Sequence, residues 1–136
     1  MIGRPALSYA REGLAEYQKR LQRLASLNID CLGKDRGTEE NSRLHLERSR
    51  GSLRIALDER GEAWSTTELL TRVNAWEQRA VKRVSLMVGG ADGHNASLRE
   101  SADYVWALSP LTLQHELALV VLLEQIYRIY TLKRGE

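Results

Sequence analysis

The chain has no phenylalanine, one cysteine and two prolines among its 136 residues. The lone cysteine, Cys31, excludes a disulfide within these residues and any cysteine-rich metal site. Without Phe, a core must be built mainly from Leu, Val, Ile and Ala. Its largest side chains would then be Trp64, Trp76 and Trp106.

Long hydrophobic runs are also lacking. The longest apolar run, Leu117–Leu123, has seven residues, whereas a membrane-spanning helix needs about twenty. No secretory signal follows Arg4. We therefore expect a cytoplasmic protein without a membrane partner. The net charge of +2 excludes little. The more basic first half fits either a phosphate-facing surface or an ordinary solvated one.

Histidine is scarce, and no two histidines have the spacing of metal ligands, so we expect no metal. His45 and His94 fall on segments predicted to lie at the surface, where they would be inert. His115 falls in the first turn of a predicted helix, where the neutral imidazole is favoured. Two roles stay open for it: positioning a substrate, or a partly buried polar group.

Periodicity predicts a single α/β domain over residues 1–136. Leu14, Tyr17, Leu21 and Leu24 recur at helical spacing, and Ser65 to Glu68 form a capping box. Strands that alternate with helices indicate a mainly parallel sheet with helices on both faces. The expected order is helix 7–24, strand 27–31, helix 39–48, strand 53–57, helix from 65, strand 84–88, helix 96–102, strand 104–108 and helix 114–133.

Two loops follow predicted strands, where open α/β sheets bind ligands. Gly89–Gly93 (GGADG) is either a plain tight turn or a ligand loop whose backbone approaches closely. It matches neither standard phosphate fingerprint. Leu108–Leu113 (LSPLTL) could wall an adenine. Its plain alternative places Leu111 and Leu113 in the core, with Ser109 or Thr112 capping the next helix.

The last predicted helix is apolar on nearly all sides from Leu117 to Tyr130. A helix of this kind must be covered all round. A second copy of the chain could supply the cover in a homodimer, or the helix could lie wholly inside one subunit.

Several stretches together resemble the RlmH family of SPOUT methyltransferases, and their order and spacing are more specific than any one of them. They cover most of the chain and are weakest from about Ser26 to Leu53. The matching stretches are Glu12–Tyr17 with Leu21, Ile55–Gly61 (IALDERG), Val84–Gly93 (VSLMVGGADG), Leu108–Leu113, His115, Leu122–Arg128 (LLEQIYR) and Gly135-Glu136.

The resemblance implies a SPOUT fold with a C-terminal trefoil knot and a homodimer. It also implies that S-adenosyl-L-methionine is the cofactor and that the substrate is a pseudouridine of 23S rRNA, methylated at N3 in the assembled ribosome. Arg128 and the basic first helix are candidates for phosphate contacts, with solvent-facing or dimer-pairing arginines as the alternative. The residues implied to bind the cofactor are Leu57, Gly89, Leu108, Ser109, Pro110, Leu111, Thr112 and Leu113.

The sequence departs from the family pattern at both ends and at two internal positions. Only Met1 and Ile2 precede Gly3, where the family has a full strand, so the first strand is expected to be missing. The Pro-Tyr-His-Arg-like tail that follows in the family is also missing, so no catalytic residue is assigned. Inside the chain, Leu119 stands where an arginine is common and Gln114 where a proline is common.

Three functions follow as hypotheses. The first is an active rRNA methyltransferase, which the ordered family match favours. The second is a catalytically impaired homologue that binds cofactor or ribosome without turnover, motivated by the two short ends. The third is an unrelated nucleotide-binding enzyme of doubly wound type, motivated by the glycine-rich loop alone.

Overall fold

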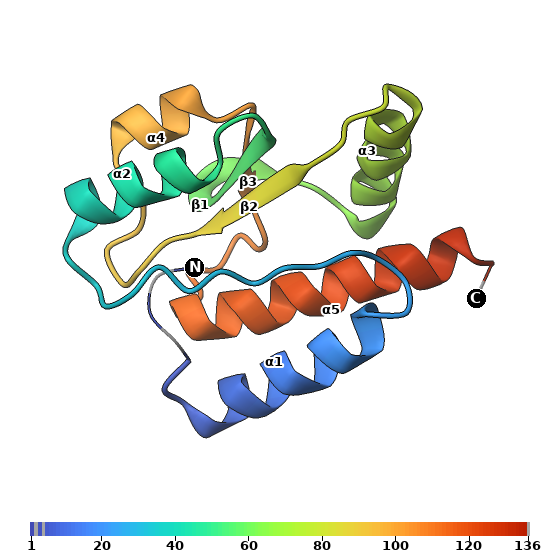
Figure 1. Ribbon diagram of the computed structural model, residues 1–136, viewed down its shortest axis with the longest axis horizontal. Coiled ribbons are helices and arrows are strands. Elements are labelled where there is room, and N and C mark those ends of the chain that lie inside the picture. Colours follow the sequence, from blue (N-terminus) through green and yellow to red (C-terminus); the bar gives the residue numbers. More distant parts are fainter. Residues whose placement is uncertain (2, 4, 136) are drawn as a thin grey trace.

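The structure, a computed structural model, describes residues 1, 3 and 5–135. All five predicted helices are present, and strands alternate with helices from residue 53 onward (Figure 1). Ile2, Arg4 and Glu136, including the last residue of the Gly135-Glu136 match, lie outside the described residues. The elements are α1 Ser8–Leu21, α2 Thr38–Arg48, β1 Leu53–Ala63, α3 Thr66–Gln78, β2 Val84–Val88, α4 Ala96–Ser101, β3 Tyr104–Ala107 and α5 His115–Lys133.

The three strands form one sheet in the order β2-β1-β3, with both pairs parallel. The chain passes from β1 through α3 to β2, and then through α4 to β3 on the other side of β1. The order therefore reverses at β1. The crevice beyond the carboxyl ends of the strands at such a reversal is the usual ligand position of open α/β sheets.

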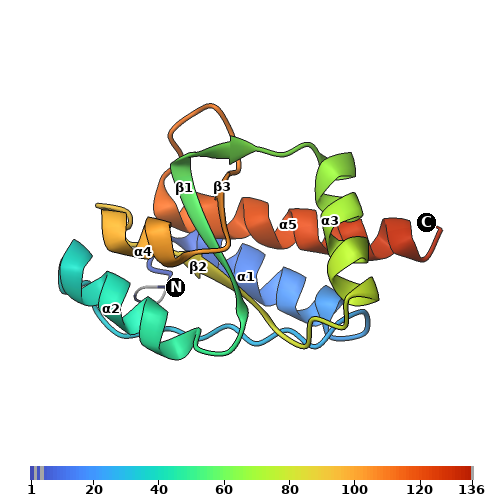
Figure 2. The same ribbon diagram turned by 90° about the horizontal axis from the view of Figure 1, so that it is seen from above.

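Alternation along the strands divides the core into two parts. Ile55, Val88 and Trp106 belong to the larger cluster, which includes residues of α5. Their neighbours Ala56 and Met87 belong to a smaller cluster with Leu98 of α4. Successive strand residues point to opposite faces. The two faces of the sheet are therefore covered by different helices, α5 on one side and α4 with α2 on the other (Figures 1 and 2).

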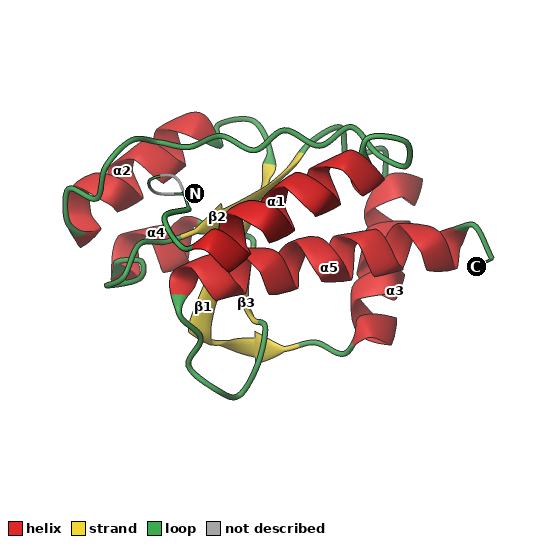
Figure 3. Cartoon of the chain, turned by 90° about the horizontal axis from the view of Figure 1, so that it is seen from below, coloured by secondary structure: helices red, strands yellow, loops and turns green. Residues whose placement is uncertain are grey.

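The helix α5 is sandwiched between α1 and the rest of the domain. Figures 1 and 3 show α1 lying along its outer side, and α5 also contacts α3 and β2. Its buried residues Leu119, Leu122, Leu123 and Ile129 face this interior. Most of the all-round apolar surface is therefore covered by the same chain. Among the large apolar side chains of the helix, Leu117 and Leu132 stay exposed, at 38% and 43%.

The predicted strand at 27–31 is wrong. This segment is extended but is assigned to no strand. Its backbone bonds go instead to Met1, whose ammonium donates to the Asp30 carbonyl (2.9 Å) and whose carbonyl accepts from Leu32 N–H (2.9 Å). Gly3 N–H also donates to the Gly33 carbonyl, at 2.6 Å. A strand needs a neighbour along its whole length, and these bonds reach only residues 30–33.

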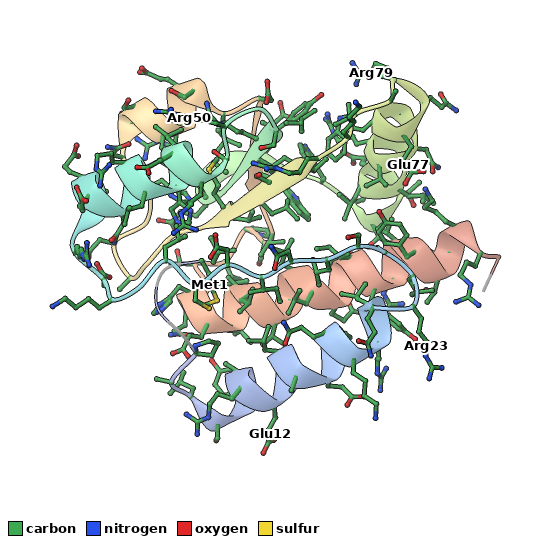
Figure 4. All side chains as sticks on the ribbon, in the orientation of Figure 1. Met1, Glu12, Arg23, Arg50, Glu77 and Arg79 are labelled. Atoms are coloured by element: carbon green, nitrogen blue, oxygen red, sulfur yellow. The ribbon has the colours of Figure 1, made fainter. Side chains whose placement is uncertain are left out.

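The described residues contain no strand before α1. The edge of β2 that does not face β1 is therefore unpaired by any strand. A cavity of about 990 Å³ lies beside it, lined by β2, by the segment 26–30 and by α5. Figure 4 shows Met1 inside the fold near α5, while Glu12 and Arg23 lie at its edge.

Candidate functional site

The register of the sheet gathers the three predicted cofactor segments at one edge. Leu57 pairs with Val88 on one side and with Trp106 on the other. Gly89 follows Val88 directly, and Leu108 stands two residues after Trp106. The glycine-rich loop, residues 89–93, and the leucine-rich loop, residues 108–113, therefore flank the middle strand at the carboxyl ends of the strands. This is where the order of the strands reverses.

The glycine-rich loop is compact. Gly90 and Gly93 form an isolated bridge, and Gly93 N–H donates to the Gly90 carbonyl at 3.1 Å. Gly89 is buried, and a Cβ there would lie 3.1 Å from the Gly93 carbonyl carbon and 3.2 Å from Cε1 of His94. A side chain would therefore push against backbone. This geometry requires glycine and is compatible with both sequence-based alternatives, a plain tight turn and a ligand loop, so the ligand loop stays a prediction.

The leucine-rich loop is open by contrast. Leu111 is 72% exposed, and Pro110 and Thr112 are exposed too. Leu111 N–H donates to Ser109 Oγ at 3.0 Å, which turns the chain locally. The plain alternative is therefore wrong for Leu111, which plugs no core.

The cap of α5 also differs from the plain alternative, which expected Ser109 or Thr112 to cap this helix. Gln114 caps the helix, and its side-chain oxygen accepts from Glu116 N–H at 2.9 Å and from Leu117 N–H at 3.0 Å. Neither Ser109 nor Thr112 is the cap. Leu108 and Leu113 are half-buried, and Leu108 packs against the larger cluster. The loop is thus anchored at its ends and free in its middle.

A turn within β1 connects both loops, and the sequence did not identify it as part of the site. The strand pairs with Trp106 both at Leu57 and at Glu62, so residues 58–61 bulge out between them. Glu59 in this bulge accepts a hydrogen bond from the Thr112 hydroxyl. The only signal was Asp58-Glu59-Arg60-Gly61, which predicted a turn that ends the strand, whereas β1 continues to Ala63.

The same bulge is also linked, through Arg99 of α4, to His94, which directly follows the glycine-rich loop. The Asp58 side chain is 3% exposed and lies 3.7 Å from Arg99 Nη1. Arg99 in turn donates to the His94 carbonyl at 2.6 Å. Arg60 N–H donates to Asp58 Oδ1 at 2.9 Å. A buried carboxylate needs such partners, because an isolated charge would be costly to bury.

His45 and His94 are not at the surface, contrary to prediction. Both are 3% exposed, and their rings meet edge to face with centroids 5.2 Å apart beneath the glycine-rich loop. His94 Nε2 lies 2.8 Å from the Met87 carbonyl, while His45 Nε2 and His94 Nδ1 have no hydrogen-bond partner among the described residues. Burial lowers the pKa of both rings, that of His45 to about 3.

His115 and Arg128 are placed apart from each other along α5. His115 is half-buried in the first turn, with Nδ1 at 3.3 Å from Gln114 Nε2. Arg128 is exposed and pairs with Glu124 four residues earlier. In α1, Arg20 pairs with Glu16 at 2.7 Å and lies over the ring of Tyr17. These cations have surface partners, which fits a plain surface role at least as well as phosphate contact.

Among the described residues, no group of three or more His, Cys, Asp and Glu side chains could hold a metal ion. Within the same residues, no helix is both long and apolar enough to span a membrane.

Comparison with known proteins identifies the family of the chain. The model of a family described as "Predicted SPOUT methyltransferase" matches residues 1–136. The chain is 48% identical over 134 residues to the ribosomal RNA large subunit methyltransferase H of Thermus thermophilus, with 98% of this chain and 90% of that protein covered. It is 37% identical over 135 residues to the protein of the same name from Deinococcus deserti, with 99% and 92% covered.

A third relative of that name, from Polynucleobacter asymbioticus, is 34% identical over 135 residues, with 98% of this chain and 91% of the relative covered. The match spans nearly the whole chain in each case, including the region from 26 to 53. The hypothesis of an unrelated nucleotide-binding enzyme is therefore set aside. The chain belongs to the SPOUT methyltransferase family, within the group of ribosomal RNA large subunit methyltransferase H proteins.

Proposed function

We propose that this protein methylates large-subunit ribosomal RNA and uses S-adenosyl-L-methionine as the methyl donor. The observation that carries the proposal is the row of paired residues Leu57, Val88 and Trp106. It brings the glycine-rich and leucine-rich loops to either side of the middle strand. The relatives' names give the substrate class, and the resemblance narrows the target to N3 of a pseudouridine in 23S rRNA of the cytoplasmic ribosome.

The residues present fit the donor. Gly89 has no room for a side chain, because a Cβ would press on Gly93 and His94, so only glycine allows this tight turn beside the ends of the strands. Leu111 offers an apolar surface that is 72% exposed in the free protein, and covering it with an adenosyl group would remove that surface from water. The proposed donor-binding set is Leu57, Gly89, Leu108, Ser109, Pro110, Leu111, Thr112 and Leu113.

The chemistry asked of these residues is mainly positioning. When bound, S-adenosyl-L-methionine supplies a methyl group activated by its sulfonium charge. The two loops would orient the donor toward the RNA base, and orientation alone can contribute several kcal/mol to a rate. The N3 proton of the target must leave. We assign this step to no residue, and the trefoil knot of the family likewise stays a prediction.

We further propose a homodimer formed through the amino-terminal ends of α1 and α5. These ends are joined, because Glu116 accepts hydrogen bonds from the N–H groups of Ala6 and Leu7. Leu7, Tyr9 and Leu117 are exposed there, at 40%, 45% and 38%. Apolar side chains gathered at one place typically mark an interface. This patch adjoins the end of the leucine-rich loop, so a second subunit there would lie next to the donor site.

The function is tested by incubating the protein with ribosomes that lack the modification and with methyl-labelled donor. We expect label in 23S rRNA at a single pseudouridine. Calorimetry with the donor runs in parallel. Donor binding without methyl transfer would instead support the catalytically impaired homologue. Neither binding nor transfer would contradict both. Sedimentation or light scattering of wild type against Leu117→Asp tests the dimer.

A further inference from the structure

The helix α2 buries polar side chains, although it lies in the part of the chain that resembles the family least. Its buried residues are Asn41, Ser42 and His45, at 3%, 1% and 3% exposure. They fall at helical spacing on one face. Burying polar groups costs free energy unless they find partners. Where these partners lie therefore shows what the face is for.

The partners lie on the glycine-rich loop and the residues that follow it. Ser42 Oγ accepts from Asn95 N–H at 3.1 Å, and the His45 ring meets the His94 ring. From the first turn of α2, Glu39 accepts a hydrogen bond from the Asn95 side chain at 3.1 Å. The buried face of α2 thus contacts the segment 94–95, which connects the loop to α4.

Asp35 extends this contact to the loop itself. Its Oδ1 accepts from Gly37 N–H at 2.9 Å and from Asn41 Nδ2 at 2.8 Å, which fixes the carboxylate. The other oxygen then faces Gly90 so closely that a Cβ on Gly90 would lie 2.6 Å from it. Asn41 is fixed in turn, because its Oδ1 accepts from Arg36 N–H at 3.0 Å.

The charge of Asp35 is maintained by the same surroundings. The N–H of Gly37 and then the amide of Asn41 lower the pKa of Asp35, and the backbone of Ala91 adds to this. A carboxylate that accepts several backbone N–H bonds favours its ionised form. The ionised Asp35 carboxylate is therefore a stronger hydrogen-bond acceptor for N–H groups of the loop than the protonated acid would be.

We propose that Asp35, Asn41 and Ser42 are positioning residues that hold the glycine-rich loop in the shape that receives the methyl donor. They act through the backbone of Gly90 and Asn95 and touch no reacting atom. The inference rests on the proposed donor site. It assigns a role in donor affinity to the segment 35–42. Pre-forming a binding loop raises affinity because less ordering is left for the moment of binding.

The test compares Asp35→Asn with Arg43→Gln. Asp35→Asn keeps the size of the side chain but removes one of its two acceptor oxygens. Arg43 is the neighbour of Ser42 on the exposed side of α2, and its partners within residues 1, 3 and 5–135 are Glu40 and Glu47. Arg43→Gln therefore controls for a general weakening of the helix. Both variants alter exposed positions, so both should fold, which thermal unfolding verifies.

Calorimetry with S-adenosyl-L-methionine is expected to show a five- to tenfold higher Kd for Asp35→Asn and an unchanged Kd for Arg43→Gln. In the ribosome assay, the KM for the donor should rise by the same factor. The kcat at saturating donor and the KM for ribosomes should stay at wild-type values, a split that a general loss of stability would not produce. Ser42→Ala should give the same pattern more weakly.

Three results would overturn the inference. The first is wild-type donor affinity in Asp35→Asn. The second is an equal loss of affinity in Arg43→Gln. The third is a lower kcat with an unchanged KM for the donor. If the wild-type protein binds donor and only the variant comparison fails, the proposed function survives. If the wild-type protein binds no donor, both the function and this inference are overturned.

Discussion

The two loops of the candidate site are built in opposite ways. The glycine-rich loop and the residues that follow it are fixed by α2 and by the segment before it, with Asp35 against Gly90 and Ser42 against Asn95. The leucine-rich loop is held at its ends, while Leu111 in its middle is 72% exposed. One wall of the site is therefore formed before any ligand arrives. The other must lose conformational freedom on binding, which costs free energy at that step.

Low pH should destabilise the glycine-rich loop and leave the leucine-rich loop unchanged. We expect this to be the largest of the predicted effects. The pKa of His45 is lowered by burial to about 3, against 6.5 in an unfolded chain, and that of His94 is lowered too. Unfolded chains therefore bind protons that the folded protein excludes. The free energy of unfolding keeps the full contribution of these buried rings above pH 6.5, and it loses this contribution as the pH falls from 6.5 toward 3. At pH 4.5 the loss from His45 is about 3 kcal/mol.

Thermal unfolding between pH 7 and pH 4.5 measures this loss, and hydrogen exchange locates it. His45→Gln removes one of the buried rings and should flatten the profile, whereas Arg43→Gln should leave its shape unchanged. Parallel profiles for wild type and His45→Gln would contradict the assignment of this loss to His45, and faster exchange spread evenly over the domain would contradict its location at the glycine-rich loop.

A methyl group on the fixed wall should be nearly as damaging. The Cβ of Gly89→Ala would press on the backbone of Gly93 and the ring of His94. Overpacking of this kind costs about 1–3 kcal/mol, so both the free energy of unfolding and the donor affinity should fall. Denaturant unfolding and calorimetry measure the two. A variant with wild-type stability would show that this wall is softer than the structure implies.

A truncation in the leucine-rich loop should lower donor affinity but leave stability nearly unchanged. Leu111→Ala removes a side chain that contacts solvent in the free protein, so stability should change by less than about 0.5 kcal/mol. Donor affinity should still fall roughly tenfold, because covering a leucine contributes about 1.5–3 kcal/mol. The same two measurements apply. An equal fall in stability and affinity would remove the distinction between the two walls.

The smallest effect is expected at the link between the leucine-rich loop and the bulge of β1. Thr112→Val removes the hydrogen bond to Glu59 and keeps the shape of the side chain. At an exposed site its loss should cost about 0.5 kcal/mol or less. We expect faster hydrogen exchange at 109–113 and a donor affinity lowered two- to threefold. Unchanged exchange would show that the link does not order the loop.

Parts of this architecture were predictable because they depend on local pattern. The predicted strand at Leu53–Leu57 lies within β1, and the capping box at Ser65, whose hydroxyl accepts from Glu68 N–H at 3.1 Å, begins α3. The strand at 27–31 failed for a non-local reason. Its alternation is that of a strand, but the pairing that the described residues supply, from Met1 and Gly3, reaches only residues 30–33.

The sequence alone determined the parallel α/β class, the five helices and the two loops. The period of hydrophobic residues and the positions of glycines are local properties of the sequence. The order and spacing of the motifs indicated the family. Only the tertiary structure decided what lies beneath the glycine-rich loop. Asp35 and Asn41 come together with Gly90 across some fifty residues of chain, and His45 meets His94. Burial and pairing of polar groups depend on distances in space, and no period in the sequence encodes them.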